Sequence, residues 1–176
     1  MINDYLGEGN IILIGFMGAG KTAVGQALAR ELGFDYLDTD ELIAKTAQKT
    51  ISQIFATEGE ERFRELETEV LKTLIDYDNF VIATGGGIVL RDENVALLKE
   101  IGPRVLLWAE PAVIFKRVSL ELHRPLLKVA DPLAEINKLL KVREPIYRQV
   151  ADQIIDTSTL NISQVVEEIK QWLKSK

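Results

Sequence analysis

Cysteine is absent from this sequence of 176 residues. Its absence excludes disulfide bonds, thiolate nucleophiles and thiolate metal ligands, and it is typical of proteins that work in a reducing compartment. The first ten residues also lack the basic stretch and the apolar run of a signal or transit peptide. We therefore expect a cytoplasmic protein.

Positive charge is scarce as well, and long apolar runs are missing. Lysine and arginine number 21 against 27 aspartate and glutamate residues, for a net charge of −6. This balance is the opposite of the basic surface that binds nucleic acid, so we expect no nucleic-acid partner. Apolar runs such as 11–14 and 105–108 are far shorter than the ~20 residues that span a bilayer. We expect no membrane partner and interpret these runs as buried strands.

The alternation of segments along the chain predicts an α/β fold. A hydrophobic content of 47% is enough for a core, and the length fits one domain, which we place at residues 1–176. Short apolar runs alternate with longer amphipathic segments, as in strand–helix–strand units that cover both faces of a parallel sheet. The predicted strands are 11–15, 34–38, 80–83, 104–109 and 152–156.

Apolar residues at helical spacing predict the helices between these strands. Residues 21–32 show this spacing and end at Gly33, a residue that commonly stops a helix. The same spacing continues over 50–75, where Gly59 divides two predicted helices. A last helix begins after a predicted Asn161 cap.

A phosphate-binding loop is the strongest motif. Residues 15–22 read GFMGAGKT and match G-x-x-x-x-G-K-[ST] between an apolar strand and a helix. Its glycines let backbone N–H groups converge on phosphate oxygens, and the helix N-terminus adds partial positive charge. We expect Lys21 to reach the β- and γ-phosphates and Thr22 to bind Mg²⁺. The predicted ATP-binding residues of the loop are Gly15, Gly18, Ala19, Gly20, Lys21, Thr22 and Ala23.

The plain alternative to this loop is a glycine-rich turn with a surface lysine. The agreement of strand, loop, lysine, threonine and helix disfavours it. The loop alone does not separate kinases from GTPases or motor ATPases. The guanine-reading Asn-Lys-x-Asp segment is absent, and the chain is short for the larger ATPase machines. The choice therefore depends on the residues around the phosphate acceptor.

Two carboxylates, Asp38 and Asp40, follow the second predicted strand. They are expected at the carboxyl edge of the sheet, where ligands of open α/β sheets bind. One could order Mg²⁺ and its waters while the other accepts the proton of an attacking hydroxyl. The alternative is that one of them only caps the helix that follows.

A second glycine-rich loop, residues 85–87, follows the third predicted strand. Three consecutive glycines allow the backbone to approach a ligand that a Cβ atom would exclude. A plain turn needs one glycine and rarely three, so the pattern favours ligand approach over turn geometry alone.

Two arginines are candidates for binding a carboxylate. Arg64 lies three residues before Glu67 on a predicted helix, so Glu67 can hold its guanidinium in place. An ordinary exposed ion pair, worth less than ~1 kcal/mol, explains this spacing equally well. The same two alternatives apply to Arg143.

Residues 118–130 lack clear periodicity and contain Pro125. Arg117 directly precedes this stretch, and Arg124 lies within it. Arginine is expected where a lid closes over phosphates or where a side chain stacks on a base. We therefore expect a mobile excursion here that takes part in ATP binding.

The ordered set of these motifs resembles the shikimate kinases over about residues 10–156. The residues that carry it are Gly20, Lys21, Thr22, Asp38, Thr39, Asp40, Phe63, Arg64, Glu67, Gly85, Gly86, Gly87, Arg124, Pro125, Leu126, Leu127, Arg143 and Tyr147. The resemblance implies a three-layer α/β/α fold, similar to nucleoside monophosphate kinases, with a five-stranded parallel sheet in the order 2-3-1-4-5. It also implies a substrate-binding region at about 39–76 and a lid at about 117–130.

The resemblance further implies a reaction, the transfer of the ATP γ-phosphoryl group to the 3-hydroxyl of shikimate, on the route to chorismate and the aromatic amino acids. The catalytic residues would be Lys21, Asp40 as the base, and Arg124. Thr22 and Asp38 would hold Mg²⁺, and Arg117 and Arg124 would bind ATP. The substrate-binding residues would be Asp40, Arg64, Glu67, Gly85, Gly86, Gly87 and Arg143. We expect a monomer whose partners are ATP and shikimate.

The chain departs from the family pattern between Arg117 and Arg124. The family usually has several polar and basic residues there, whereas residues 118–123 read VSLELH, with no lysine or arginine. His123, the only histidine, is interpreted as a solvated lid residue. The spacing of the two flanking arginines is kept, so we expect the lid to close.

Two alternatives to this function remain open. The first is a gluconate or nucleotide kinase built on the same scaffold, since gluconate is also a small hydroxylated acid. The second is a non-catalytic nucleotide-binding regulator. Such a regulator would be expected to lose Lys21 or Asp40, and both are present.

Overall fold

The structure is a computed structural model that describes residues 9–120 and 128–176. Five parallel strands form one sheet in the order β2-β3-β1-β4-β5, which confirms the predicted order. The strands are β1 (Ile11–Ile14), β2 (Asp35–Asp38), β3 (Phe80–Ala83), β4 (Arg104–Trp108) and β5 (Gln153–Asp156). No strand end differs from its predicted position by more than one residue.

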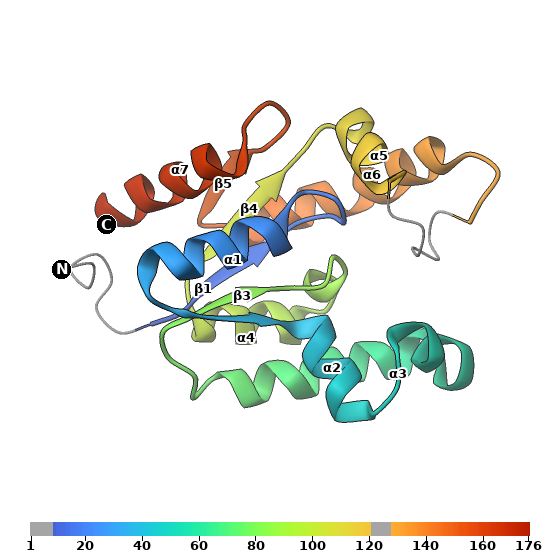
Figure 1. Ribbon diagram of the computed structural model, residues 1–176. Coiled ribbons are helices and arrows are strands. Elements are labelled where there is room, and N and C mark those ends of the chain that lie inside the picture. Colours follow the sequence, from blue (N-terminus) through green and yellow to red (C-terminus); the bar gives the residue numbers. More distant parts are fainter. Residues whose placement is uncertain (1–8, 121–127) are drawn as a thin grey trace.

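Helices cover both faces of this sheet, so the predicted three layers are confirmed. Figure 1 shows α1 in front of the sheet and α4 and α6 behind it. The helices are α1 (Lys21–Leu32), α2 (Thr39–Ala47), α3 (Ile51–Leu74), α4 (Asp92–Ile101), α5 (Pro111–Val118), α6 (Pro132–Val150) and α7 (Ile162–Lys174), with a 3-10 turn η1 (Ile88–Leu90).

Strand β1 shows how the sequence divides the interior into two cores. All four of its residues are fully buried, because the strand is central and both of its faces are covered. Ile11 and Leu13 pack with side chains of α1 and α7, whereas Ile12 and Ile14 pack with those of α3, α4 and α6. The continuous apolar run therefore reflects two buried faces of a pleated strand.

The ends of the helices follow the predicted signals. Gly33 ends α1 in the left-handed conformation, with φ of 70°. Gly59 interrupts α3 with φ of 84° and ψ of 172°, so the predicted division into two helical parts is confirmed. Asn161 caps α7, and its side chain accepts a hydrogen bond from the backbone N–H of Gln164. Thr50 caps α3 in the same way, a cap that the sequence analysis missed.

The carboxyl edge of the sheet gathers the segments that matter for function. The loop to α1, the β2–α2 junction and the loop after β3 all leave the sheet at this edge. The predicted lid, 117–130, begins in the last turn of helix α5, and residues 121–127, with His123, Arg124 and Pro125, lie outside the described residues. None of the helices in residues 9–120 and 128–176 combines the length and apolar character that a membrane span requires.

Candidate active site

The phosphate-binding loop connects β1 to α1 in a conformation that its glycines permit. Gly15 has φ of +146°, and a Cβ atom there would lie 2.4 Å from the carbonyl oxygen of Leu107 in β4. Gly20, with φ of 101°, precedes α1, and no side chain caps the helix there. The first N–H groups of α1 are therefore left to bind an anion, as the motif predicts.

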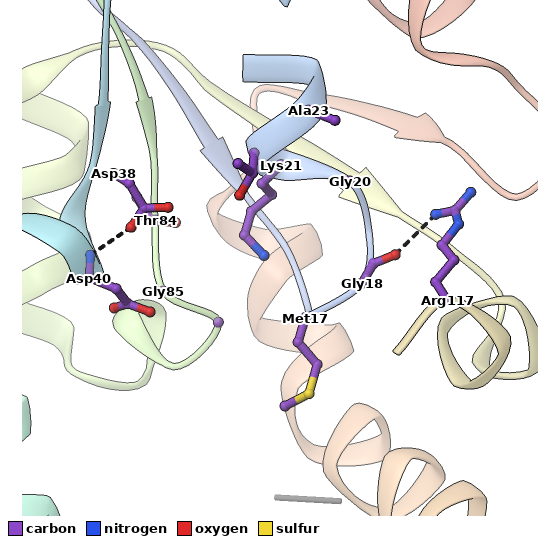
Figure 2. Close-up of a pocket in the computed structure, with 12 residues that line it drawn as sticks. Met17, Gly18, Gly20, Lys21, Ala23, Asp38, Asp40, Thr84, Gly85 and Arg117 are labelled. Atoms are coloured by element: carbon purple, nitrogen blue, oxygen red, sulfur yellow. Dashed lines mark hydrogen bonds between the residues drawn. The ribbon is translucent and has the colours of Figure 1, made fainter. Parts of the chain in front are cut away.

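Lys21 lies along this loop. Its Nζ donates hydrogen bonds to the carbonyl oxygens of Gly15, at 2.7 Å, and Phe16, at 2.9 Å. Figure 2 shows Lys21 between two sets of residues, with Asp38 and Asp40 on one side and Gly18 and Arg117 on the other. The ammonium group is thus held at the centre of the loop, where bound phosphates would meet it.

One cavity of about 370 Å³ extends from the phosphate loop to Asp38, Asp40 and the second glycine-rich loop. Residues from both glycine-rich loops line it, together with both predicted carboxylates (Figure 2). The lining residues are Met17, Gly18, Gly20, Lys21, Thr22, Ala23, Asp38, Asp40, Thr84, Gly85, Gly86 and Arg117. Ten of these twelve were predicted from the sequence; Met17 and Thr84 were not.

Asp38 caps α2, which was the alternative to a metal-binding or catalytic role for one of the two carboxylates. Its Oδ1 accepts hydrogen bonds from the backbone N–H groups of Asp40, at 2.8 Å, and Glu41, at 3.2 Å. Asp38 also lines the cavity, as Thr22 does. Capping and ion binding are compatible here, since both hydrogen bonds use the same carboxylate oxygen, Oδ1.

Thr22 and Asp38 suit Mg²⁺ better than a metal that requires three or more protein ligands. Among the described residues no group of three or more His, Cys, Asp or Glu side chains could hold a metal ion. Mg²⁺ prefers hard oxygen donors and usually keeps several waters beside one or two protein groups. A hydroxyl and a carboxylate lining the phosphate cavity match that donor set.

Two of the three glycines at residues 85–87, Gly85 and Gly87, have no room for a Cβ atom. A Cβ on Gly85 would lie 2.7 Å from Asp40 Oδ1, and one on Gly87 would lie 2.4 Å from Arg64 Nη1. A Cβ on Gly86 would be 3.5 Å from Arg143 Nη1, an ordinary contact. The glycine loop therefore lies directly against predicted substrate-binding side chains of the protein itself, and the approach of a ligand to its backbone stays a prediction.

Arg64 and Glu67 form a buried ion pair on α3. Arg64 Nη1 lies 2.9 Å from Glu67 Oε2, and the Glu67 side chain is fully buried. Arg64 Nη2 also bonds the exposed Glu60, at 3.1 Å. Because one partner is fully buried, the alternative of an ordinary exposed pair does not describe this contact.

Burial and neighbouring charges change the protonation equilibria of this pair. Burial raises the pKa of the Glu67 carboxyl; the Arg64 guanidinium opposes the rise and the charge of Asp40 adds to it. Burial lowers the pKa of Arg64, but the carboxylates of Glu67 and Glu60 outweigh it, so the net pKa is raised. Arg64 therefore stays charged and available to a ligand carboxylate.

Arg143 and Tyr147 approach the glycine loop from α6. Arg143 is buried, and its guanidinium lies 5.7 Å from the centre of the Phe16 ring. The Tyr147 hydroxyl donates a short hydrogen bond to the carbonyl oxygen of Gly86. Burial raises the pKa of Tyr147 to about 12. The tyrosine is therefore neutral and acts as the donor that fixes the loop to α6.

Arg117 is tied to two segments that the sequence places far apart. Its guanidinium donates to the Gly18 carbonyl, at 3.1 Å, and to the hydroxyl and carbonyl oxygens of Thr157, at 3.1 and 2.7 Å. The Gly18 contact is drawn in Figure 2. Thr157 was missed in the sequence analysis, because its partner lies 40 residues away and no local pattern announces the contact.

The predicted residues thus fall into three groups. Most line the cavity, as described above. Arg64, Glu67, Gly87 and Arg143 lie behind it around the glycine loop, and Gly15 and Ala19 support the phosphate loop. Arg124 lies outside the described residues.

Comparisons with known proteins agree on one family. The sequence model described as "Shikimate kinase" matches residues 17–174. A shikimate kinase of Thermodesulfovibrio yellowstonii is 49% identical over 160 residues, which cover 91% of this chain and 92% of the relative. The solved structure titled as the shikimate kinase from Acinetobacter baumannii in complex with shikimate is 40% identical, with a TM-score of 0.90, covering 95% and 93% of the two chains.

A more distant structure bears on the gluconate alternative. A gluconokinase from Sinorhizobium meliloti has a TM-score of 0.61 and 17% identity, covering 95% of this chain and 92% of that one. Identity this low shows a common fold alone.

Proposed function

This chain belongs to the shikimate kinase family, and on that premise we propose how its own residues transfer the γ-phosphoryl group of ATP to the 3-hydroxyl of shikimate. One observation carries the proposal. The cavity lined by the phosphate loop ends at a glycine loop against which two arginines lie, the buried Arg143 and the largely buried Arg64. A nucleotide-phosphate site and a carboxylate site are therefore adjacent.

On the phosphate side, the backbone N–H groups of residues 15–22 and the ammonium group of Lys21 bind the β- and γ-phosphates. Thr22 and Asp38 hold Mg²⁺, which supplies positive charge to the phosphate oxygens when it is bound with ATP. Arg117, fixed between Gly18 and Thr157, borders the nucleotide. Arg124 stays predicted as the lid residue that adds charge to the phosphoryl group.

On the acceptor side, Arg64 and Arg143 bind the shikimate carboxylate from two directions, and Glu67 keeps Arg64 in place. Asp40, which lines the cavity, binds the hydroxyl groups and acts as the base. The 3-hydroxyl oxygen forms the new bond to the γ-phosphorus while the bond between that phosphorus and the bridging oxygen breaks. ADP leaves with the electron pair, and the hydroxyl proton passes to Asp40.

The reaction depends mainly on placement of charge and exclusion of water, since phosphoryl transfer needs little covalent chemistry from the protein. We propose that the whole chain, 1–176, forms one kinase domain, with substrate bound by residues 39–76 and a lid at 117–130. We further propose a cytoplasmic monomer without nucleic-acid or membrane partners. Light scattering of the purified protein tests the monomer directly.

A coupled assay of ADP release with shikimate, gluconate and AMP, each with ATP and Mg²⁺, tests the function. We expect turnover with shikimate at least ~10²-fold above the other two, because only shikimate presents its carboxylate and 3-hydroxyl to both halves of the site. Comparable turnover with gluconate would favour the gluconate kinase. Absence of turnover with all three substrates would favour the non-catalytic regulator.

A further inference from the structure

A chain of buried polar contacts lies behind the acceptor side of the site. The Thr68 hydroxyl of α3 lies 2.6 Å from Asn94 Oδ1 of α4. The Asn94 Nδ2 group donates to the carbonyl oxygen of Ile88 in η1, at 3.0 Å. Both side chains are buried, Thr68 at 5% exposure and Asn94 at 0%. We call these two residues the Thr68–Asn94 link.

The proton positions along the link follow from the donors available. Thr68 Oγ1 also lies 3.2 Å from the carbonyl oxygen of Arg64. A hydroxyl carries one proton, so we assign it to the shorter contact with Asn94. The Asn94 amide is then acceptor toward Thr68 and donor toward Ile88. Each end of the amide therefore fixes a different element.

The link joins the two segments that carry Arg64 and the glycine loop of the proposed carboxylate site. Thr68 is one helical turn after Arg64 and directly follows Glu67. Ile88 directly follows Gly87, the residue against which the Arg64 guanidinium packs. Helices α3 and α4 lie side by side (Figure 1), and the link joins both of them to the end of the glycine loop.

We propose that Thr68 and Asn94 are positioning residues for the substrate carboxylate, because they set the distance between Arg64 and the glycine loop; the proposal rests on the carboxylate site proposed above. Apolar side chains of similar size would fill the same space between α3 and α4. A buried amide and hydroxyl cost desolvation unless they are bonded, and their bonds add a fixed direction that apolar packing lacks.

The distance that the link controls has little tolerance. A Cβ atom on Gly87 would lie within 2.7 Å of three guanidinium atoms of Arg64, so the guanidinium lies flat on the loop backbone. A small shift of α3 toward the loop would create a clash, and a shift away would move Arg64 off the loop that Arg143 also approaches. Misplacement of a binding group by about 1 Å can cost ~10²-fold in rate.

The experiment compares Thr68→Val and Asn94→Leu, which remove the polar atoms and keep similar volume, with the parent enzyme. We expect the KM for shikimate to rise ~3–10-fold, while the KM for ATP and kcat stay within ~2-fold. Thr68→Ser keeps the hydroxyl and should restore the KM for shikimate. The double variant should be no worse than the poorer single variant, since both act through one link.

Thr73→Val provides the matched control. Thr73 is also on α3, and its hydroxyl bonds the carbonyl oxygen of Val70 in the same helix, at 2.7 Å. Its replacement should leave the KM for shikimate unchanged. Melting temperatures of all variants show how far each one is destabilised, so that a loss of fold is not counted as a loss of positioning.

Binding of shikimate and of shikimate methyl ester separates this proposal from the carboxylate site itself. If the parent enzyme binds acid and ester equally, the carboxylate site is wrong whatever the link does. If the parent prefers the acid, the link variants should lose affinity for the acid and keep their affinity for the ester. Unchanged affinities, or parallel losses for ATP and shikimate, in Thr68→Val would overturn the positioning role; should Asn94→Leu fail to fold, Thr68→Val decides alone.

Discussion

The two sides of the cavity are constructed differently. Eight consecutive residues, 15–22, form the phosphate side, and most of its binding groups are backbone N–H groups. Four separate segments form the acceptor side: side chains come from the start of α2, the middle of α3 and α6, and backbone comes from the glycine loop. The phosphate side therefore depends on local conformation, whereas the acceptor side depends on packing. Changes to the two sides should affect different steps of the reaction.

The largest effect is expected on the phosphate side from Lys21→Ala. This change removes the charge at the centre of the loop, and we expect kcat to fall ~10²–10³-fold. Shikimate affinity, measured by calorimetry, should stay within ~2-fold because the acceptor side is intact. Lys170→Ala, which removes an exposed pair with Glu31, serves as the control and should leave kcat unchanged. A large loss of shikimate affinity in Lys21→Ala would show that the two sides are not separable.

On the acceptor side, Arg64→Ala should raise the KM for shikimate about 10²-fold, because it removes a charged partner of the carboxylate and leaves Glu67 buried without its ion pair. The KM for ATP should change by less than ~3-fold. Arg62→Ala is the matched control, since Arg62 is on the same helix and pairs with the exposed Glu65 and Glu69. Equal effects on both substrates in steady-state assays would contradict the division.

A smaller change, Gly87→Ala, tests the packing of the acceptor side without removing a functional group. The added Cβ would lie 2.4 Å from Arg64 Nη1 and should displace the guanidinium. The backbone of Gly87 has φ of −95°, which alanine adopts without strain. We expect the KM for shikimate to rise about 10-fold. In the Arg64→Ala background the same change should add little, and an additive effect would mean that Gly87 acts elsewhere.

The smallest effect concerns stability at high pH. Tyr147 has a pKa of about 12 in the folded state against 10.0 otherwise, chiefly because it is buried. The folded state therefore holds the proton more tightly than the unfolded state. The resulting contribution to the free energy of unfolding, about 2 to 3 kcal/mol, is fully present below pH 10 and is lost as the pH rises toward 12. Urea unfolding at pH 8 to 11 should show a shallower decline for Tyr147→Phe. An equal decline would show that Tyr147 is not the group responsible.

The same division explains what the sequence could predict. The strands were predictable because apolar runs such as 11–14 are buried on both faces, and residues 15–22 because a contiguous motif specifies one conformation. Asp38 and Asp40 were predictable because a strand end fixes their place at the sheet edge, although the sequence alone left open which of them caps α2.

The contacts that assemble the acceptor side were not predictable from local pattern. Tyr147 and Gly86 are 61 residues apart, and Thr68 and Asn94 are 26 apart, so neither pairing follows from helical or strand spacing. Glu67 is buried near Asp40 of α2, the glycine loop and Arg143 of α6, and no periodicity separates it from an exposed glutamate on the same helix. The family resemblance supplied Arg64 and Arg143 as a pair; only the packed structure shows that both rest on one loop.

The most direct test of the carboxylate site compares the kcat/KM of the unmodified enzyme for shikimate with that for shikimate methyl ester. The same comparison is then made for Arg64→Ala. The ester keeps the 3-hydroxyl and removes only the negative charge that Arg64 and Arg143 are proposed to bind. We predict a preference for the acid of at least ~10²-fold in the parent and a much smaller preference in the variant, in which Arg143 alone remains to bind the carboxylate. Equal use of acid and ester by the parent enzyme would contradict the proposed carboxylate site.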